Sequence, residues 1–397
     1  MPDASSRRTR SATALAVSPT ASHAMSSPRS RGILRFMNRL PAFARSLALL
    51  TPLALLAPSL PAHAADDAAR AVAAGAGRKL VESYVYPARA NDAAEVLRRN
   101  AASGAYDGLK EAALATRLTA DIYAVLHDKH VNLRYSAEIN PPEPSAGATP
   151  GPAARAAQLK RMRQIGYGLG RVAHLPGNIG YLDVRGFPAA GDELDTVFDG
   201  AVNSIAYSDA IVLDLRRNHG GSPDSIARLL SHFLAPKTHL NDFVGRGDGD
   251  AKVTESTYTA AVPGPLITAP LYVLISSETF SGGEECAYDV QALKRGTLIG
   301  AVTGGGANPG ETRRIDDHFL IFVPSERARN PITKTNWEGV GVKPDVEVPR
   351  ERALIAAYGI AVDAKLRDAS LTAAQRDGLQ QLRAKIDTLT DADILAL

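Results

Sequence analysis

The stretch Pro270–Lys294, PLYVLISSETFSGGEECAYDVQALK, decides the fold and holds the most informative serine of the chain. Leu271–Ile275 has the length and the β-branched content of a buried strand. A polar turn follows, and the apolar spacing after Ser281 predicts a helix. Ser281 therefore lies on a strand-to-helix elbow and is followed by two glycines. Such an elbow exposes a side chain beside the free N–H groups of a helix N-terminus, which suits a nucleophile.

A simpler interpretation of the same residues is a helix cap. Ser281 would then be the N-cap, and Glu284, three residues later, would complete a capping box. For Glu284 and its neighbour Glu285 the sequence favours capping and fold roles over catalysis.

The rest of the chain predicts an α/β protein. Strand-like and helical segments alternate in a core over 161–350, which indicates a mainly parallel sheet covered by helices. Residues 65–135 are rich in Ala, Leu and Arg and predict a small helical cap domain, in which the apolar series from Leu109 to Val125 fits one long helix. Residues 136–160 predict a Pro/Gly/Ala linker, and the charged tail 351–397 predicts helices. The expected core strands are 166–172, 179–184, 210–215, 271–275, 297–302 and 319–323, and the expected core helices are 191–206, 223–234 and the one after Ser281.

The first 64 residues predict a signal peptide with a basic leader. They are rich in arginine and contain one acid, Asp3, before an apolar run that ends in Ala62-His63-Ala64, a small-x-small cleavage site. The alternative is a disordered basic tail joined to an uncleaved anchor. The formal net charge of +3 comes from this leader, and the mildly acidic remainder gives no reason to expect nucleic acid as a partner. Cys286 is the only cysteine, so no intramolecular disulfide is possible.

Three further stretches combine glycines with polar side chains. Asp214–Gly221 runs from a buried strand into a Gly-Gly turn, whose N–H groups could face an oxyanion. Thr303–Gly310 is a glycine-rich loop, but no Gly-Lys-Ser/Thr follows it, so a phosphate cradle is a weak interpretation. Asn330–Asp345 sets the only tryptophan, Trp337, beside an acid, Glu338.

These pieces together resemble the S41 family of serine peptidases, which includes the tail-specific and tricorn proteases. The branch that they resemble is the one named after interphotoreceptor retinoid-binding protein. The resemblance implies a crotonase-like αβ core with a small helical cap, a periplasmic or secreted setting, and cleavage of peptides or proteins by an activated serine. The pieces that carry it are DKH at 128–130, GNIGYLDVRGF at 177–187, LDLRRNHGG at 213–221, TFSGGEE at 279–285 and TNWEGVGVKPD at 335–345.

The resemblance also implies roles for single residues. Ser281 falls at the nucleophile, His130 at the general base, and Glu338 at the acid that orients the base. The backbone N–H groups of Gly282 and of the Gly220-Gly221 turn would form the oxyanion hole. A serine hydroxyl needs such a base, and the base needs a partner that fixes its tautomer. No metal, no organic cofactor and no stable membrane insertion after signal cleavage are expected.

Two departures from the family pattern shape these predictions. Many of the processing proteases use a Ser/Lys pair, but no lysine occurs between Lys294 and Lys334. Those proteases also carry a PDZ domain, for which the segment from Tyr135 to Ile179 is too short. The tricorn-like branch has a serine beside the base, where this chain has Lys129.

Several alternatives remain open at this point. His219, beside the Gly-Gly turn, is the main rival for the base. His127 and His130 could form a metal pair at helical spacing, although no third ligand is apparent. The chain could also be a non-catalytic binding protein for an apolar ligand or peptide, or an esterase or amidase that shares the serine chemistry.

Overall fold

The computed structural model describes residues 62–143, 151–247 and 251–397. The predicted leader, 1–64, lies outside this range except for its last three residues, which form the first turn of the first helix. In the described residues no helix is both long enough and apolar enough to span a membrane.

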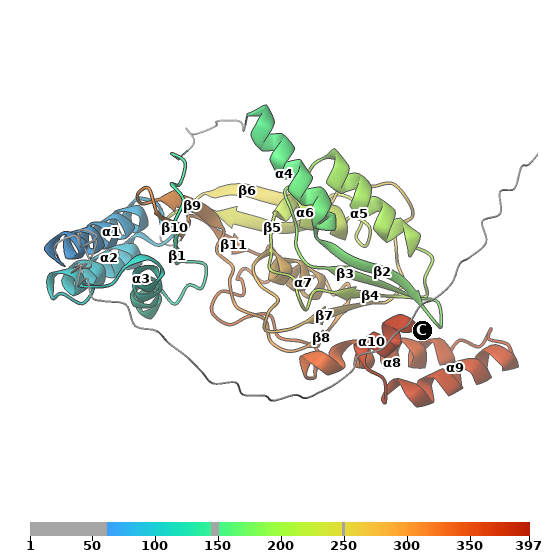
Figure 1. The fold of residues 1–397 in the computed structure, drawn as a ribbon. Helices are drawn as coiled ribbons and strands as arrows, with labels where there is room; N and C mark the ends of the chain where they lie inside the picture. Colours follow the sequence, from blue (N-terminus) through green and yellow to red (C-terminus); the bar gives the residue numbers. More distant parts are fainter. Residues whose placement is uncertain (1–61, 144–150, 248–250) are drawn as a thin grey trace, which may run out of the picture. The chain divides into compact units, whose positions relative to one another are not determined.

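The N-terminal domain contains three helices (Figure 1): α1 (Ala62–Ser83), α2 (Pro87–Ala102) and α3 (Glu111–Leu126). Pro87 opens α2 at a position where its missing N–H costs nothing. One face of α3 is buried through residues at helical spacing, namely Leu114, Leu118, Ile122 and Leu126. The helix predicted from Leu109 to Val125 is therefore present, with its ends shifted by one or two residues.

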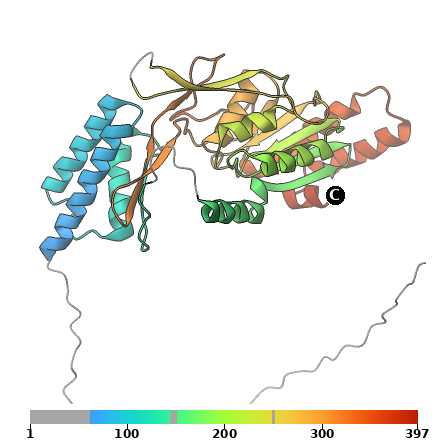
Figure 2. The ribbon, with the colours of Figure 1, turned by 90° about the horizontal axis from the view of Figure 1, so that it is seen from above.

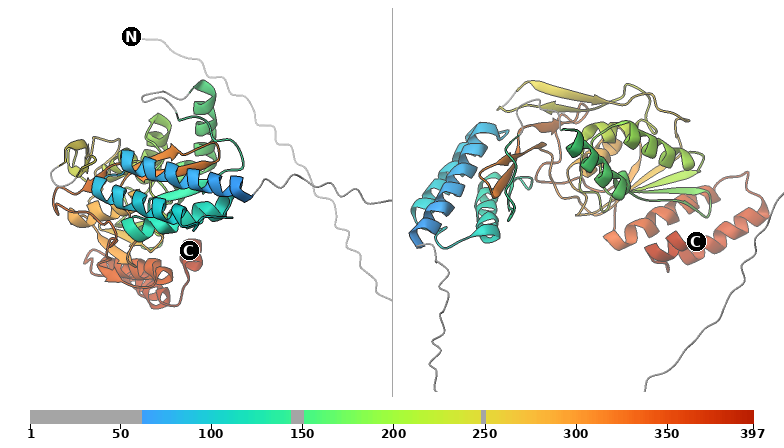
Figure 3. Two further views of the ribbon diagram at one scale, coloured as in Figure 1. Left: turned by 90° about the vertical axis from the view of Figure 1, so that its left-hand side faces the viewer. Right: turned by 45° about the horizontal axis from the view of Figure 1, so that its top comes forward.

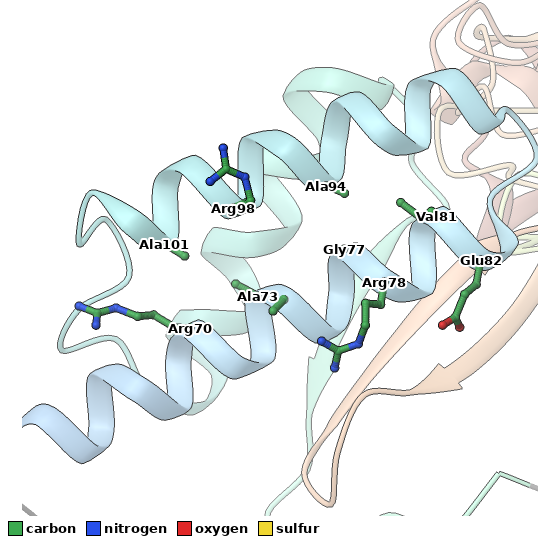
Figure 4. A pocket seen from close by; sticks show the side chains of 10 residues that line it. Arg70, Ala73, Gly77, Arg78, Val81, Glu82, Ala94, Arg98 and Ala101 are labelled. Carbon is green, nitrogen blue, oxygen red and sulfur yellow. The ribbon is translucent and has the colours of Figure 1, made fainter.

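Helices α1 and α2 pack closely because their contact is made of small residues. A Cβ atom on Gly77 would lie 3.3 Å from Cβ of Ala94. Figure 4 shows the groove that this packing leaves along the pair, where small side chains such as Ala94 lie among charged ones such as Arg78 and Arg98.

A three-stranded antiparallel sheet completes the core of this domain (Figure 2). Its order is β1-β10-β9, and Tyr135 pairs with Phe319. The inward side chains Leu133, Phe319 and Ile321 are buried against the helices. The bounds are Asn132–Tyr135 for β1, Gly310–Arg314 for β9 and Phe319–Pro324 for β10. Two of these strands come from the range predicted as catalytic core, so the helical domain is not the contiguous segment 65–135.

The α/β core is built on a six-stranded sheet with the order β12-β8-β7-β4-β3-β2. Only the β2–β3 pair is antiparallel, and the other pairs are parallel. Strands β3, β4 and β7 are buried along their whole length, as expected for parallel strands that are covered on both faces. The α/β class is thereby confirmed. The strands are β2 (Leu169–Leu175), β3 (Ile179–Val184), β4 (Ala210–Asp214), β7 (Leu271–Ile275), β8 (Thr297–Gly300) and β12 (Val346–Glu347).

Helices cover both faces of this sheet (Figure 3). Alternate strand residues such as Leu213 and Val273 pack against the first group, α5 to α7. The intervening residues, such as Val212 and Leu274, pack against the second group, α8 to α10. The first group is α5 (Asp192–Ser204), α6 (Pro223–Leu230) and α7 (Gly282–Ala292), and the second is α8 (Ala353–Leu366), α9 (Ala373–Ile386) and α10 (Asp391–Ala396).

Some elements differ from the predictions. Helix α4 (Pro152–Gln164) lies partly inside the predicted linker 136–160, because Pro152 begins a helix there and an Ala-rich run continues it. A third sheet, β11-β5-β6, was not predicted, since its strands are short and mostly polar. These strands are β5 (His239–Val244), β6 (Val253–Tyr258) and β11 (Arg327–Arg329), and two short 3₁₀ turns lie at Gly166–Gly168 and Arg350–Arg352. Between β1 and β2 the described residues form only α4 and the first of these turns, which leaves no PDZ-like domain in that range.

Candidate active site

Ser281 lies on a strained backbone between β7 and α7. Its φ and ψ are 54° and −123°, a region that non-glycine residues rarely adopt and that costs about 1–3 kcal/mol. Hydrogen bonds from the preceding turn hold the elbow on the end of β4: Thr279 Oγ1 donates to Leu215 O over 2.8 Å, and Phe280 N donates to Asn218 O over 2.9 Å. The geometry is that of a side chain presented on a sharp turn rather than of an ordinary N-cap with extended backbone.

The Gly220-Gly221 turn lies directly against this elbow. Gly220 has a φ of +99°, and a Cβ atom there would lie 2.7 Å from Cβ of Ser281. Gly221 has a φ of +140°, and a Cβ atom there would overlap the carbonyl of Phe187. Neither position can take a side chain without displacing the backbone.

The predicted set of oxyanion donors needs one correction. The Gly220 N–H donates to Asn218 Oδ1 over 2.8 Å and is therefore already used. In the described part of the chain, the N–H groups of Gly221 and Gly282 have no protein acceptor. A Cβ atom on Gly282 would lie 2.9 Å from Gly221 N, so the two backbones are adjacent. Gly221 and Gly282 are thus the pair able to bind an oxyanion. Gly220, which has no side chain, allows the turn to lie close to Ser281.

His130 follows the end of α3 and is held by its neighbour Asp128. The His130 backbone N–H donates to Asp128 Oδ1 over 2.9 Å. The imidazole is 9% exposed and packs against Phe280, with ring centroids 4.6 Å apart, and Phe322, at 5.9 Å. Neither ring nitrogen has a hydrogen-bond partner among the described residues. Burial lowers the pKa of His130, and the Asp128 carboxylate opposes that shift. A neutral imidazole with both nitrogens unpaired is suited to accept a proton.

Glu338 lies beside this histidine with one oxygen unused. Its Oε2 accepts the Ala307 N–H over 2.6 Å, whereas Oε1 is buried without a partner. Burial, and then the nearby Asp128 carboxylate, raise the pKa of Glu338 to about 8. Ligand atoms of Asp128, His130 and Glu338 all lie within 4.8 Å of one another. The second acid, Asp128, was quoted in the sequence motif but given no role there.

Asp128 is the functional residue that sequence analysis missed. Its carboxylate accepts the His130 N–H, the Tyr84 hydroxyl over 3.2 Å and the Asn308 side-chain amide over 2.9 Å. Asp128 Oδ1 lies 3.8 Å from His130 Nδ1. Its position two residues before the base was the one signal that could have pointed to it, because short polar side chains often bind a backbone N–H two residues on.

Several of the candidate site residues line one cavity of about 400 Å³. Ser281 and His130 both line it, although they are far apart in the sequence. His219 lines it as well, so the rival base is also near, but its side chain is exposed. Lys129 is a further lining residue, and its Nζ donates to Gly304 O over 2.6 Å. Glu338 is not among the lining residues of this cavity.

The trio of Asp128, His130 and Glu338 has the composition of a divalent metal site, since it offers one imidazole and two carboxylates. The metal pair considered from the sequence is different: the ring of His127 packs on Tyr123 at 5.8 Å and does not belong to the trio.

Comparison with known proteins identifies the core. Residues 178–348 match the profile of peptidase family S41. This stretch is an S41 peptidase domain. The match contains Ser281, Glu338 and the Gly-Gly turn, whereas His130 lies before it. The family predicted from the motifs is thus confirmed, and the branch within it stays a prediction.

Similar solved structures are peptidases and a lipoprotein. A proposed peptidase from Parabacteroides merdae has 19% identity and a TM-score of 0.48, over 64% of this chain and 84% of that one. A photosystem II D1 C-terminal processing protease has 17% identity and a TM-score of 0.43, over 71% and 94%. A lipoprotein from Streptococcus agalactiae has 12% identity and a TM-score of 0.47, over 75% and 96%.

Proposed function

We propose that the protein is a periplasmic or secreted serine peptidase that forms an acyl-enzyme on Ser281. The observation that carries this is the shared cavity: a strained, half-buried serine and a buried histidine with two unpaired ring nitrogens line the same hollow. The S41 domain supports peptide-bond hydrolysis as the reaction.

The proposed reaction uses the residues in a fixed order. Ser281 Oγ attacks the scissile carbonyl while its proton passes to His130, and the N–H groups of Gly221 and Gly282 bind the resulting oxyanion. His130 then gives the proton to the leaving amine, and the amine departs. A water molecule, deprotonated by His130, attacks the acyl-enzyme and releases the acid product. Glu338 would accept the second imidazole N–H and stabilise the imidazolium.

Covalent labelling by a fluorophosphonate probe tests this function. The wild-type mature protein should label on Ser281, as shown by peptide mapping, and Ser281→Ala should lose both labelling and peptide hydrolysis by several orders of magnitude. Ser277→Ala is the matched control, because Ser277 is an exposed serine of the same turn. If wild type neither labels nor cleaves any peptide library, a binding protein on the same fold becomes the better explanation. Cleavage of esters but not peptides would instead indicate an esterase.

The proposed location rests on the leader. The arginine-rich residues 1–64 and the Ala62-His63-Ala64 site support export with cleavage after Ala64. The intact mass of the protein from the periplasm or medium should start at or next to Ala65. Retention of the leader in that mass would contradict cleavage.

A further inference from the structure

Glu284 is a buried acid that the reaction above does not use. It lies in the first turn of α7 and is completely shielded from solvent. Its two oxygens accept four hydrogen bonds. Oε2 accepts from Ser281 N over 2.9 Å and Gly306 N over 2.8 Å, and Oε1 accepts from Gly305 N over 2.6 Å and the Thr303 hydroxyl. The capping interaction predicted with Ser281 is therefore one part of a larger network.

The loop that Glu284 binds, residues 303–308, also contacts the residues around the proposed base. Gly305 O accepts from Gly339 N over 3.0 Å, and Gly306 O accepts from Trp337 Nε1 over 2.7 Å. The next two residues continue the series: Ala307 N donates to Glu338 Oε2, and Asn308 Nδ2 donates to Asp128 Oδ2.

The same loop also touches the imidazole. A Cβ atom on Gly306 would lie 2.7 Å from His130 Cε1 and 2.4 Å from the Phe280 ring. The loop backbone therefore fixes how closely His130 can approach the nucleophile elbow.

We propose that Glu284 is a positioning residue that sets the geometry between Ser281 and the His130–Glu338 pair, an inference that rests on the proposed function. One carboxylate binds the nucleophile's own backbone N–H and the loop that contacts the base and its acid. The single side chain of Glu284 therefore holds in place both the nucleophile and the loop that contacts its base. Small errors in such geometry are costly, because a displacement of about 1 Å lowers a rate about 100-fold.

The network requires a carboxylate and not merely a side chain of this size. All four partners donate, so a glutamine at this position would face two donors with its own NH₂ group. The Thr303 hydroxyl could rotate to accept, but Gly305 N, Gly306 N and Ser281 N cannot. At least one backbone N–H would lose its acceptor, and the loop would move.

Glu285 provides a matched control on the adjacent position. It is also buried in α7, but its contact is Asn241 Nδ2, 3.4 Å away, rather than the loop. Burial, and then Asp289, raise the pKa of Glu285 well above its usual range. Glu285→Gln replaces this acid by an amide of nearly equal shape without touching the loop.

The test compares Glu284→Gln with Glu285→Gln in steady-state kinetics and in the rate of fluorophosphonate labelling. For Glu284→Gln, kcat and the labelling rate should both fall about 100-fold, while KM stays within about threefold of wild type. For Glu285→Gln both should stay within about threefold. A purely structural role would instead lower the fraction of protein that labels and the melting temperature, with normal kcat per labelled site. That result would overturn the inference.

A second pair of variants covers the case in which Glu284→Gln does not fold. Thr303→Val removes one donor from the loop side, and Thr303→Ser retains the hydroxyl. Thr303→Val should lower kcat without changing KM, and Thr303→Ser should restore it. Equal kcat in the two variants would count against the network. Failure of wild type to label would reject the proposed function itself, whereas normal labelling of Glu284→Gln would reject only the role of Glu284.

Discussion

At the scale of single residues, the choice of base can be made between two histidines of one cavity. His130 is buried behind two aromatic rings and next to two carboxylates. His219 is exposed and has no acid partner among the described residues. A general base needs a partner that fixes its tautomer, and only His130 has candidates for that role.

We therefore expect His130→Ala to lose about as much activity as Ser281→Ala, because members of a triad act as a unit. His219→Ala should leave most of the activity, with some loss because it flanks the Gly221 N–H. Comparing kcat/KM of the two variants on one peptide decides the matter. A nearly active His130→Ala enzyme with an inactive His219→Ala enzyme would falsify the assignment and place the base in the Gly-Gly turn.

The dependence of activity on pH should reflect the ionisation of both His130 and Glu338. His130 acts in its neutral form, so activity is lost as the pH falls through its pKa, which burial places below the usual 6.5. An imidazole at its ordinary pKa would give a rise through about pH 6 to 7, and burial of His130 moves that step lower. Glu338 stabilises the His130 imidazolium most strongly when it is ionised, so a second rise in kcat/KM should occur near its pKa of about 8.

Glu338→Gln tests the upper step, because an amide cannot ionise. The variant should keep the lower step and lose the upper one, and its activity above pH 8 should fall below wild type. An unchanged upper step in Glu338→Gln would mean that another group titrates there.

At the scale of elements, the hairpin β9–β10 belongs to the helical domain by packing although it follows the nucleophile in sequence. Ile321 is fully buried against α1 to α3, whereas Leu320, its neighbour, points to the other face and is half-buried. Alternation along a strand explains the difference. The hairpin is therefore part of the core of the helical domain.

Truncation of these two residues should show that dependence. Ile321→Ala should lower the free energy of unfolding by about 2–5 kcal/mol, the cost of a cavity in a core. Leu320→Ala should cost about 1 kcal/mol. Urea unfolding of both variants measures the difference, and equal losses would contradict the assignment of Ile321 to the helical core.

The elements differ in how well the sequence predicts them. The core strands β3, β4 and β7 were predicted because each is a short apolar run with turn residues at its ends. Strands β5 and β6 were missed because residues such as Asn241, Asp242 and Glu255 interrupt the apolar pattern. The Ser281 elbow could be predicted because its geometry is local. The contacts of Asp128 and Asn308 could not, because they join residues that only the complete fold brings together.

At the scale of the whole molecule, the charge of the active-site cavity suggests which peptides it favours. Lys129, Arg134 and His219 line it, and no Asp or Glu of the described residues does. Such a lining attracts negative groups and repels positive ones, most strongly at low ionic strength.

Peptides with Glu next to the cleaved bond should therefore be cut faster than matched peptides with Lys, by about tenfold at low salt and less at high salt. Arg134→Gln should reduce this ratio, whereas Arg161→Gln, on the exposed helix α4, should not. Competition between the two peptides in one reaction measures the ratio directly. A preference for Lys would show that the lining charges do not face the substrate.

The late position of the β9–β10 hairpin has a consequence for the order of synthesis. Asn308 binds Asp128 across 180 residues, and the helical domain waits for residues 319–324 to finish its core. Domains normally fold as they leave the ribosome, N-terminal part first. Here the first domain cannot mature until most of the polypeptide has been translated. The nascent chain therefore contains Ser281 before the helical domain next to His130 has completed its core.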